Sequence, residues 1–346
     1  MKKEGKKWML VVLALLAVVT VTLPLVGCKN DTVAEQTGDG TGSGSGNQGS
    51  GDPEQPVTYT VSFITNGGGS IDSQTIVSGQ TATKPADPTL ENNVFGGWYS
   101  DEGLTSEYDF TTPVTGSFPL YAKWVKRIEV IADDVSSEIA GLTGDGSYIL
   151  VVTGELNDLS AIRTALSSNK SAKVNLDLSK ATDLTTIGDS AFRRCSGLTS
   201  ITIPASVTSI GDYAFSGCSG LTSIDLSKAT GLTTIGNDAF YGCKSLTSIS
   251  IPSSVTSIGG DAFYGCSGLT SISIPSSVTS IGEAAFSGCS GATVKVEAEN
   301  PPTWGSGVFE DVSKILVPKD SVKEYMEAEN WKEYSGKIEA IPNQTS

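Results

Sequence analysis

Hydrophobic positions between residues 174 and 318 return at a nearly fixed interval. One phenylalanine marks each copy, and successive phenylalanines are 23, 25, 23, 23 and 23 residues apart: Phe192, Phe215, Phe240, Phe263, Phe286 and Phe309. A period of this length indicates a solenoid, in which each rung buries its apolar side only against neighbouring rungs. We therefore expect a stack of coils with a shared dry interior in this part of the chain.

The pattern inside one copy predicts which residues face inward. Leu198, Ile201 and Ile203 are expected to point inward from a short strand, which Pro204 ends because proline fixes φ and lacks an N–H. An Ala-Phe pair follows, where a single helical or 3₁₀ turn would close the coil. A glycine follows the same isoleucine in each copy, and we expect these glycines to adopt positive φ: Gly188, Gly211, Gly236, Gly259 and Gly282.

The segments on either side of the repeats have the pattern of caps. Residues 126–173 predict a short helix at 133–142, an apolar strand at 148–152 and a second amphipathic helix after Asp158. Residues 319–346 predict a further helix with Tyr325 and Trp331 on its apolar side. Because a terminal rung exposes its apolar end unless something covers it, we expect an N-terminal α/β cap and a C-terminal cap.

Residues 57–125 read as a separate small β-rich domain. Tyr59–Phe63 alternates apolar and polar residues, as a half-buried strand does. Phe95, Trp98 and Trp124 could form a sugar-binding platform, but in a domain of this size they are expected to form the core.

The first 56 residues predict targeting and a tether. A basic start and an apolar run from Trp8 to Val26 end in Leu25-Val26-Gly27-Cys28, which resembles the lipobox of bacterial lipoproteins. The resemblance implies that residues 1–28 are a signal peptide ending at a lipidated Cys28. The alternative is one membrane-spanning helix with its positive charges inside. Residues 29–56 are rich in Gly, Ser and Thr and predict a disordered tether.

The composition of the chain limits the partners and the kinds of activity that we expect. The net charge of −15 argues against a nucleic-acid partner, and a chain without histidine lacks the commonest general base and metal ligand. No catalytic motif, cofactor site or metal site is recognised, so we expect a protein that is not an enzyme. Five cysteines stand three residues after a phenylalanine: Cys195, Cys218, Cys243, Cys266 and Cys289. We interpret them as buried free thiols, because stacked rungs hold Cβ atoms too far apart for a bridge; a disulfide or metal ladder is the alternative.

Two rows of residues are candidate binding surfaces. The first is the outward strand position: Asp177, Thr202, Asp225, Ser250 and Ser273. The side chains at this position are small and polar, and a surface that only keeps the protein soluble would have the same kind of residues. The second follows each phenylalanine and contains Tyr241 and Tyr264, which we expect to be adjacent and exposed. They are either contact residues or ordinary solvated tyrosines.

Two segments of the chain resemble known protein families. The Leu-x-x-Ile-x-Ile-Pro, Ile-Gly, Ala-Phe and Cys pattern of residues 174–318 is similar to the leucine-rich repeats of BspA-type surface proteins. Asn66-Gly-Gly, Gly97-Trp-Tyr and Leu120-Tyr-Ala-Lys-Trp resemble the B repeat of the internalin family, a β-grasp module. Together they imply a mainly β fold: a leucine-rich-repeat solenoid with α/β caps, preceded by a small β-grasp domain.

The same resemblances imply a function. We predict a bacterial cell-envelope lipoprotein, surface-exposed and held to the membrane through Cys28, whose solenoid binds a host extracellular protein or a bacterial surface protein as an adhesin would. The alternative is a structural or antigenic coat protein without a high-affinity ligand.

Overall fold

The structure, a computed structural model, describes residues 55–143 and 146–342. The expectations of a signal peptide, a lipidated Cys28 and a tether fall on residues 1–54 and lie outside the described residues. The described chain is mainly β, as predicted, and its buried apolar residues form two clusters. One cluster fills the upstream module, and the other runs from the N-terminal cap through every rung to the C-terminal cap.

The upstream module is built from four strands: β1 (Thr58–Ile64), β2 (Gln74–Val77), β3 (Asn93–Tyr99) and the first part of β4 (Phe118–Ile131). β1 pairs antiparallel with β2 and parallel with β4, and β3 pairs antiparallel with β4. All regular elements among the described residues of this module are strands.

The aromatic residues of this module belong to its core, as expected. Trp98 is 1% exposed and meets Phe63 edge to face with ring centroids 5.0 Å apart. Phe95 packs edge to face against both Trp98 and Trp124. The indole N–H of Trp124 donates to the Thr65 carbonyl at 2.8 Å. These contacts give the rings a structural role, with Trp98 inside the core and Phe95 and Trp124 packed against it and partly exposed.

The N-terminal cap begins inside β4. This strand runs past residue 125, where we placed the end of the upstream module, and its residues Lys126–Ile131 pair in parallel with β5 (Ser147–Glu155). The short helix η1 (Ala132–Asp134), helix α1 (Val135–Gly141) and helix α2 (Ser160–Ser168) complete the cap. β5 then pairs with the first rung strand, β6 (Lys173–Thr182), so the cap continues the sheet of the solenoid.

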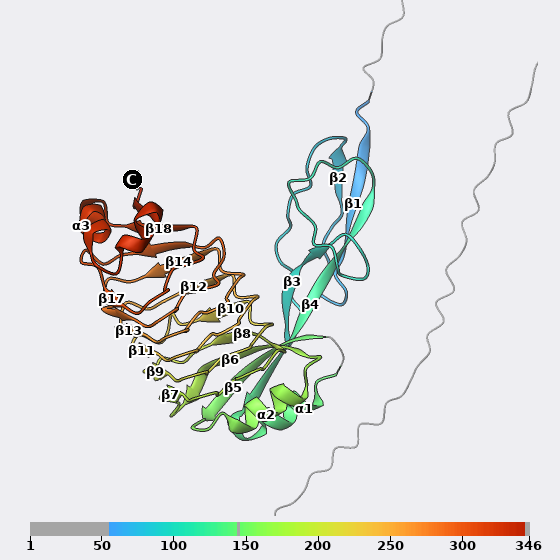
Figure 1. The fold of residues 1–346 in the computed structure, drawn as a ribbon. Helices are drawn as coiled ribbons and strands as arrows, with labels where there is room; N and C mark the ends of the chain where they lie inside the picture. Colours follow the sequence, from blue (N-terminus) through green and yellow to red (C-terminus); the bar gives the residue numbers. More distant parts are fainter. Residues whose placement is uncertain (1–54, 144–145, 343–346) are drawn as a thin grey trace, which may run out of the picture. The chain divides into compact units, whose positions relative to one another are not determined.

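The rungs stack in chain order and form two ladders of short parallel strands (Figure 1). Beyond β6, the longer strand of each rung is β8 (Leu198–Thr202), β10 (Ser223–Asp225), β12 (Ser248–Ser250), β14 (Ser271–Ile274), β16 (Thr293–Val296) and β18 (Lys314–Val317). The shorter strand is β7 (Thr186–Ile187), β9 (Ser209–Ile210), β11 (Thr234–Ile235), β13 (Ser257–Ile258), β15 (Ser280–Ile281) and β17 (Thr303–Trp304).

Register follows the sequence repeat, so equivalent residues face one another. Ile201 lies opposite Ile224, and Ile249 opposite Ile272. The ladder of longer strands is divided into β6-β8-β10 and β12-β14-β16-β18. The division falls at the 25-residue interval, where Leu221–Gly236 is two residues longer than Leu198–Gly211. The coil that follows β10 is therefore the longer one, and the ladder of shorter strands continues unbroken through it.

The phenylalanines form a continuous stack in the interior. All six are 0% exposed, neighbouring ring centroids lie 5.1–5.6 Å apart, and the rings are parallel to within 11°. Each interior ring is therefore covered on both faces by its neighbours, and the prediction of stacked rungs with a shared interior is confirmed.

The five cysteines of the described residues are buried free thiols, as predicted. Each thiol from Cys218 onward donates to the carbonyl of the phenylalanine one rung earlier: for Cys218 to Phe192 the distance is 2.9 Å, and for Cys266 to Phe240 it is 3.1 Å. A thiol suits this position because it is small, apolar and still a weak donor. In the last rung the position is occupied by Val312, also buried.

The prediction of positive φ at the glycine after each isoleucine is wrong. In the described turns, positive φ occurs two residues later, at Ser190, Tyr213, Asp238, Asp261 and Ala284 (φ 51–57°), and again at glycines such as Gly242 and Gly265. The glycine after the isoleucine is needed for another reason. A Cβ on Gly236 would lie 2.7 Å from the carbonyl carbon of Gly211 in the preceding rung. Only a residue without a side chain permits this approach between backbones.

Replacing one of these glycines tests this explanation. We expect Gly236→Ala to destabilise the solenoid by about 2–3 kcal/mol, because backbone must move to admit the methyl group. The matched control is Gly188→Ala in the first rung, where an added Cβ meets nothing within 4 Å. Urea melts should separate the two variants; equal stability would contradict the role given to close approach.

The C-terminal cap covers the last rung with aromatic side chains. It consists of η2 (Lys319–Ser321), α3 (Val322–Glu327), η3 (Lys332–Lys337) and β19 (Ile338–Ala340), and β19 adds to the sheet beside β18. Trp331 is 1% exposed and packs against Phe309, the end of the phenylalanine stack. Lys337 donates to the Phe309 carbonyl, which has no cysteine of a following rung to bind it. Among the described residues, no helix is both long and apolar enough to cross a bilayer.

Candidate functional site

The predicted strand row is brought together in two runs. Asp177 lies opposite Thr202, and Thr202 lies opposite Asp225, across β6, β8 and β10. Ser250 lies opposite Ser273 across β12 and β14. Both runs are at least partly exposed, so the row forms a polar surface that the 25-residue coil divides.

Much of the hydrogen-bonding capacity of this row is already used. The carboxylates of Asp177 and Asp225 each accept the backbone N–H two residues later, at 2.9 Å. The Ser227 hydroxyl and the Ser227 N–H together lower the pKa of Asp225. The hydroxyl of Ser273 donates to Glu297. These side chains close local turns and offer no large anchor of the kind that dominates tight interfaces.

The second predicted row carries a pair of stacked aromatic rings. Tyr241 and Tyr264 are 41% and 37% exposed, and their ring centroids lie 5.1 Å apart with the planes 7° from parallel. The expectation that they are adjacent and exposed is confirmed, while their role in binding stays a prediction. In the rungs on either side the same position is occupied by Ser216 and Ser287, so the aromatic stack ends after two rings.

Two aspartates that we did not predict accompany the tyrosines. In each turn the tyrosine N–H donates to the carbonyl of the residue three positions earlier, from Tyr241 to Asp238 and from Tyr264 to Asp261, both at 3.0 Å. Partial burial raises the pKa of both carboxyl groups; the neighbouring Asp261 adds to the effect at Asp238, and Glu283 adds to it at Asp261. The signal was present in the sequence as Asp-Ala-Phe-Tyr in two consecutive copies.

The next turn toward the N-terminus extends this surface. The Arg193 guanidinium lies 5.3 Å from the centroid of the Tyr213 ring, and Tyr213 is 40% exposed. The Asp238 carboxylate raises the pKa of the Tyr213 phenol, so the three groups are close enough to interact. We call Tyr213, Asp238, Tyr241, Asp261 and Tyr264 the tyrosine–aspartate surface.

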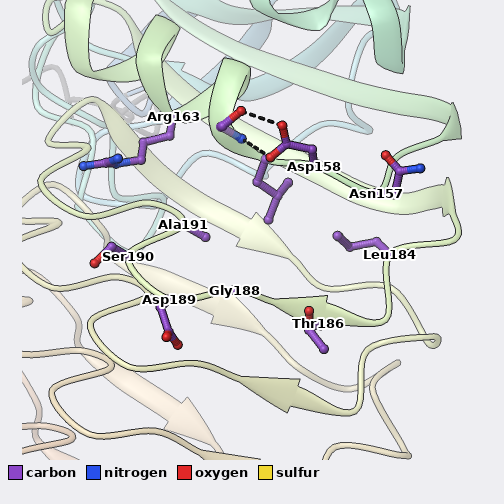
Figure 2. Close-up of a pocket in the computed structure, with 11 residues that line it drawn as sticks. Asn157, Asp158, Arg163, Leu184, Thr186, Gly188, Asp189, Ser190 and Ala191 are labelled. Atoms are coloured by element: carbon purple, nitrogen blue, oxygen red, sulfur yellow. Dashed lines mark hydrogen bonds between the residues drawn. The ribbon is translucent and has the colours of Figure 1, made fainter.

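A pocket of about 200 Å³ lies between the start of α2 and the first rung. Figure 2 shows that the Asp158 carboxylate is engaged by Ser160 and that the Arg163 side chain is directed away from it. Asp189 accepts the N–H of Asp212 in the next rung. Both carboxylates therefore act within the fold. The described residues include no group of three or more Cys, Asp or Glu arranged to hold a metal ion.

Comparison with known proteins identifies both repeat regions. Residues 175–316 match the model of the BspA type leucine rich repeat region in six copies, and residues 59–123 match the Listeria-Bacteroides repeat domain. A protein of Evansella cellulosilytica described as a putative Gly-rich membrane protein is 40% identical over 102 residues. That match covers 29% of this chain and only 11% of the relative.

Solved leucine-rich repeat proteins are also similar to the chain. One from T. pallidum is 28% identical, with a TM-score of 0.37, over 48% of this chain and 75% of that protein. One from Bacteroides ovatus is 29% identical, also with a TM-score of 0.37, over 50% of this chain and 48% of that protein. The repeat count, the residues matched and the stacked parallel strands agree: the solenoid of this chain is a BspA-type leucine-rich repeat region, preceded by a Listeria-Bacteroides repeat domain.

Proposed function

We propose that this chain is a non-enzymatic protein of the bacterial cell surface whose solenoid binds a host extracellular protein or a bacterial surface protein, as an adhesin does. Residues 1–28 would direct it to the envelope and anchor it through lipid on Cys28. The repeat family supports a role in protein interaction or as a surface repeat protein. The curated relatives described as membrane proteins support the location.

The observation that carries the proposal is the exposed tyrosine pair on a rigid scaffold. Tyr241 follows Phe240 and Tyr264 follows Phe263, and both phenylalanines are fully buried in the stack. The backbone beneath the tyrosines is therefore fixed, and the two rings already stack on each other. Tyrosine supplies a large contact area, and a side chain ordered before binding loses little conformational entropy when a partner arrives.

Binding by the full chain tests the proposal. Full-length protein in detergent would be measured by biolayer interferometry against a panel of purified host extracellular proteins and bacterial surface proteins. We expect at least one partner with a micromolar or tighter Kd, and a loss of roughly tenfold or more in Tyr241→Ala/Tyr264→Ala. The matched control, Ser250→Ala/Ser273→Ala, alters the strand row of nearby rungs and should bind normally.

Weakened binding in Ser250→Ala/Ser273→Ala together with normal binding in Tyr241→Ala/Tyr264→Ala would assign binding to the strand row instead of the tyrosines. Failure of every panel member to bind would favour the coat-protein alternative.

A further inference from the structure

We propose that the tyrosine–aspartate surface binds an arginine-rich segment of the partner protein, with guanidinium groups over the tyrosine rings and beside the two carboxylates. This inference rests on the proposed function and adds the chemistry of the partner. Four kinds of observation carry it: the repeated geometry of the turns, two carboxylates that form no ion pair, a cation that the chain itself places in the neighbouring turn, and the shape of the guanidinium group.

The geometry repeats in two successive rungs. Asp238 and Asp261 occupy the same position of consecutive turns, and each precedes its tyrosine by three residues within one hydrogen-bonded turn. The tyrosine rings stack at 5.1 Å, and the rung spacing repeats the aspartates in the same direction. The two rings therefore lie side by side on adjacent coils, and the two aspartates belong to the same two turns.

Neither carboxylate, of Asp238 or of Asp261, forms an ion pair with a lysine or arginine of the described chain. The nearby Arg193 partly offsets the raised pKa of Asp238 without pairing with it. Each carboxyl group is partly buried and close to another acidic group, and the pKa of each is raised for these two reasons. A cation placed between them would relieve the repulsion and keep both groups ionised. The overall charge of −15 would favour the approach of a basic segment.

The neighbouring turn shows such an arrangement within the chain. The Arg193 guanidinium lies over the Tyr213 ring, and the Asp238 carboxylate is near the Tyr213 phenol. Arg193 holds the position after the phenylalanine that Tyr241 and Tyr264 hold in later rungs. The Tyr213 ring thus has a cation and a carboxylate close to it, whereas no lysine or arginine of the described residues pairs with Asp261 in the following turn.

The guanidinium group fits this surface better than an ammonium. It is planar, so it stacks on an aromatic face, and its N–H groups form a fork that can bind a carboxylate with two hydrogen bonds. Lysine offers a point charge without either property. The proposal therefore predicts a preference for arginine over lysine, which simple attraction to an acidic protein would not give.

The test uses a defined probe and the full chain in detergent. A fluorescent octapeptide of alternating arginine and glycine is titrated and followed by anisotropy, beside versions in which lysine or citrulline replaces arginine. We expect the arginine peptide to bind tightest, lysine more weakly, and neutral citrulline weakest. Asp238→Asn/Asp261→Asn should weaken the arginine peptide roughly tenfold, and Tyr241→Ala/Tyr264→Ala should remove the preference over lysine.

The matched control is Asp177→Asn/Asp225→Asn, which changes the net charge equally but on the strand row. Binding of the arginine peptide should be unchanged in this control. Equal weakening in both aspartate pairs, or equal binding of the arginine and citrulline peptides, would overturn the inference. If a panel protein binds and this binding survives both the aspartate and the tyrosine substitutions, the proposed function stands and this inference fails. Circular dichroism confirms that each variant remains folded.

Discussion

Raising the pH above about 9 is expected to unfold the solenoid over a narrow range. Burial raises the pKa of Cys289 to about 12, and it raises the pKa of Cys195, Cys218, Cys243 and Cys266 as well. In the unfolded chain each thiol ionises near its ordinary pKa of 9.0. The thiols therefore contribute their full stability below pH 9 and lose it progressively as the pH rises toward the folded pKa.

The size of the effect follows from the number of equivalent thiols. One group protonated in the folded state and ionised in the unfolded state lowers the free energy of unfolding by roughly 1.4 kcal/mol per pH unit. The four thiols from Cys218 onward, whose pKa values are raised most, lower it by roughly 6 kcal/mol per pH unit, against a total stability of about 5–15 kcal/mol for an ordinary domain. We therefore expect the midpoint of alkaline unfolding near pH 10–11, within the reach of circular dichroism.

A cysteine substitution separates this mechanism from general alkaline damage. Cys266→Val places in the fourth rung the residue that Val312 provides in the last, where it is buried. In urea melts between pH 8 and 10.5, the free energy of unfolding of this variant should fall less steeply with pH than that of the parent, by roughly 1.4 kcal/mol per pH unit. An unchanged slope in the variant, or no pH dependence above pH 9 in the parent, would contradict the explanation.

Removing one ring from the interior stack should have the second large effect. We expect Phe240→Ala to lower the free energy of unfolding by ~3–5 kcal/mol, because it leaves a cavity between rings that contact it on both faces. Phe240 is 0% exposed, and both Phe215 and Phe263 lie 5.1 Å from it between centroids. Rungs on either side are joined through the same ring, so the loss should also uncouple their unfolding.

The adjacent residue provides the control. Tyr241 also stacks at 5.1 Å on a ring of the next rung but is 41% exposed. Tyr241→Ala should therefore cost less than about 1 kcal/mol. Hydrogen exchange should show the difference locally, since the N–H of Phe240 donates to Ala262 in the next rung. Similar melts for Phe240→Ala and the parent would refute the view that the stack holds the rungs together.

The features that follow directly from the repeat could be predicted from the sequence alone. The spacing of the phenylalanines predicted stacked rungs, because a residue recurring once per coil must meet its equivalents in space. The same stacking predicted free thiols, since side chains on successive rungs hold their Cβ atoms too far apart for a bridge. The same reasoning placed Tyr241 beside Tyr264.

Other features depend on how two coils approach each other, which no single copy reveals. The glycine after each isoleucine was expected to permit an unusual φ, yet its role is to let two backbones come close, as for Gly236 against Gly211. The pairing gap after β10 and the proximity of Arg193 to Tyr213 likewise arise between rungs. The spacing of the aspartates in the tyrosine–aspartate surface could be read from the sequence, but the absence of an ion pair at either one could be seen only in the structure.

The left-handed backbone of the rung turns has a consequence for how this solenoid can diversify. A residue other than glycine in this conformation sits about 1 kcal/mol above its relaxed state, and Tyr213, Asp238, Asp261 and Ala284 all adopt it, whereas Gly307 in the last rung adopts it freely. The coil would thus tolerate glycine at every one of these places, and different side chains can be exchanged there without altering the backbone path. That position is a natural place for a repeat protein to acquire new specificities while its architecture stays constant.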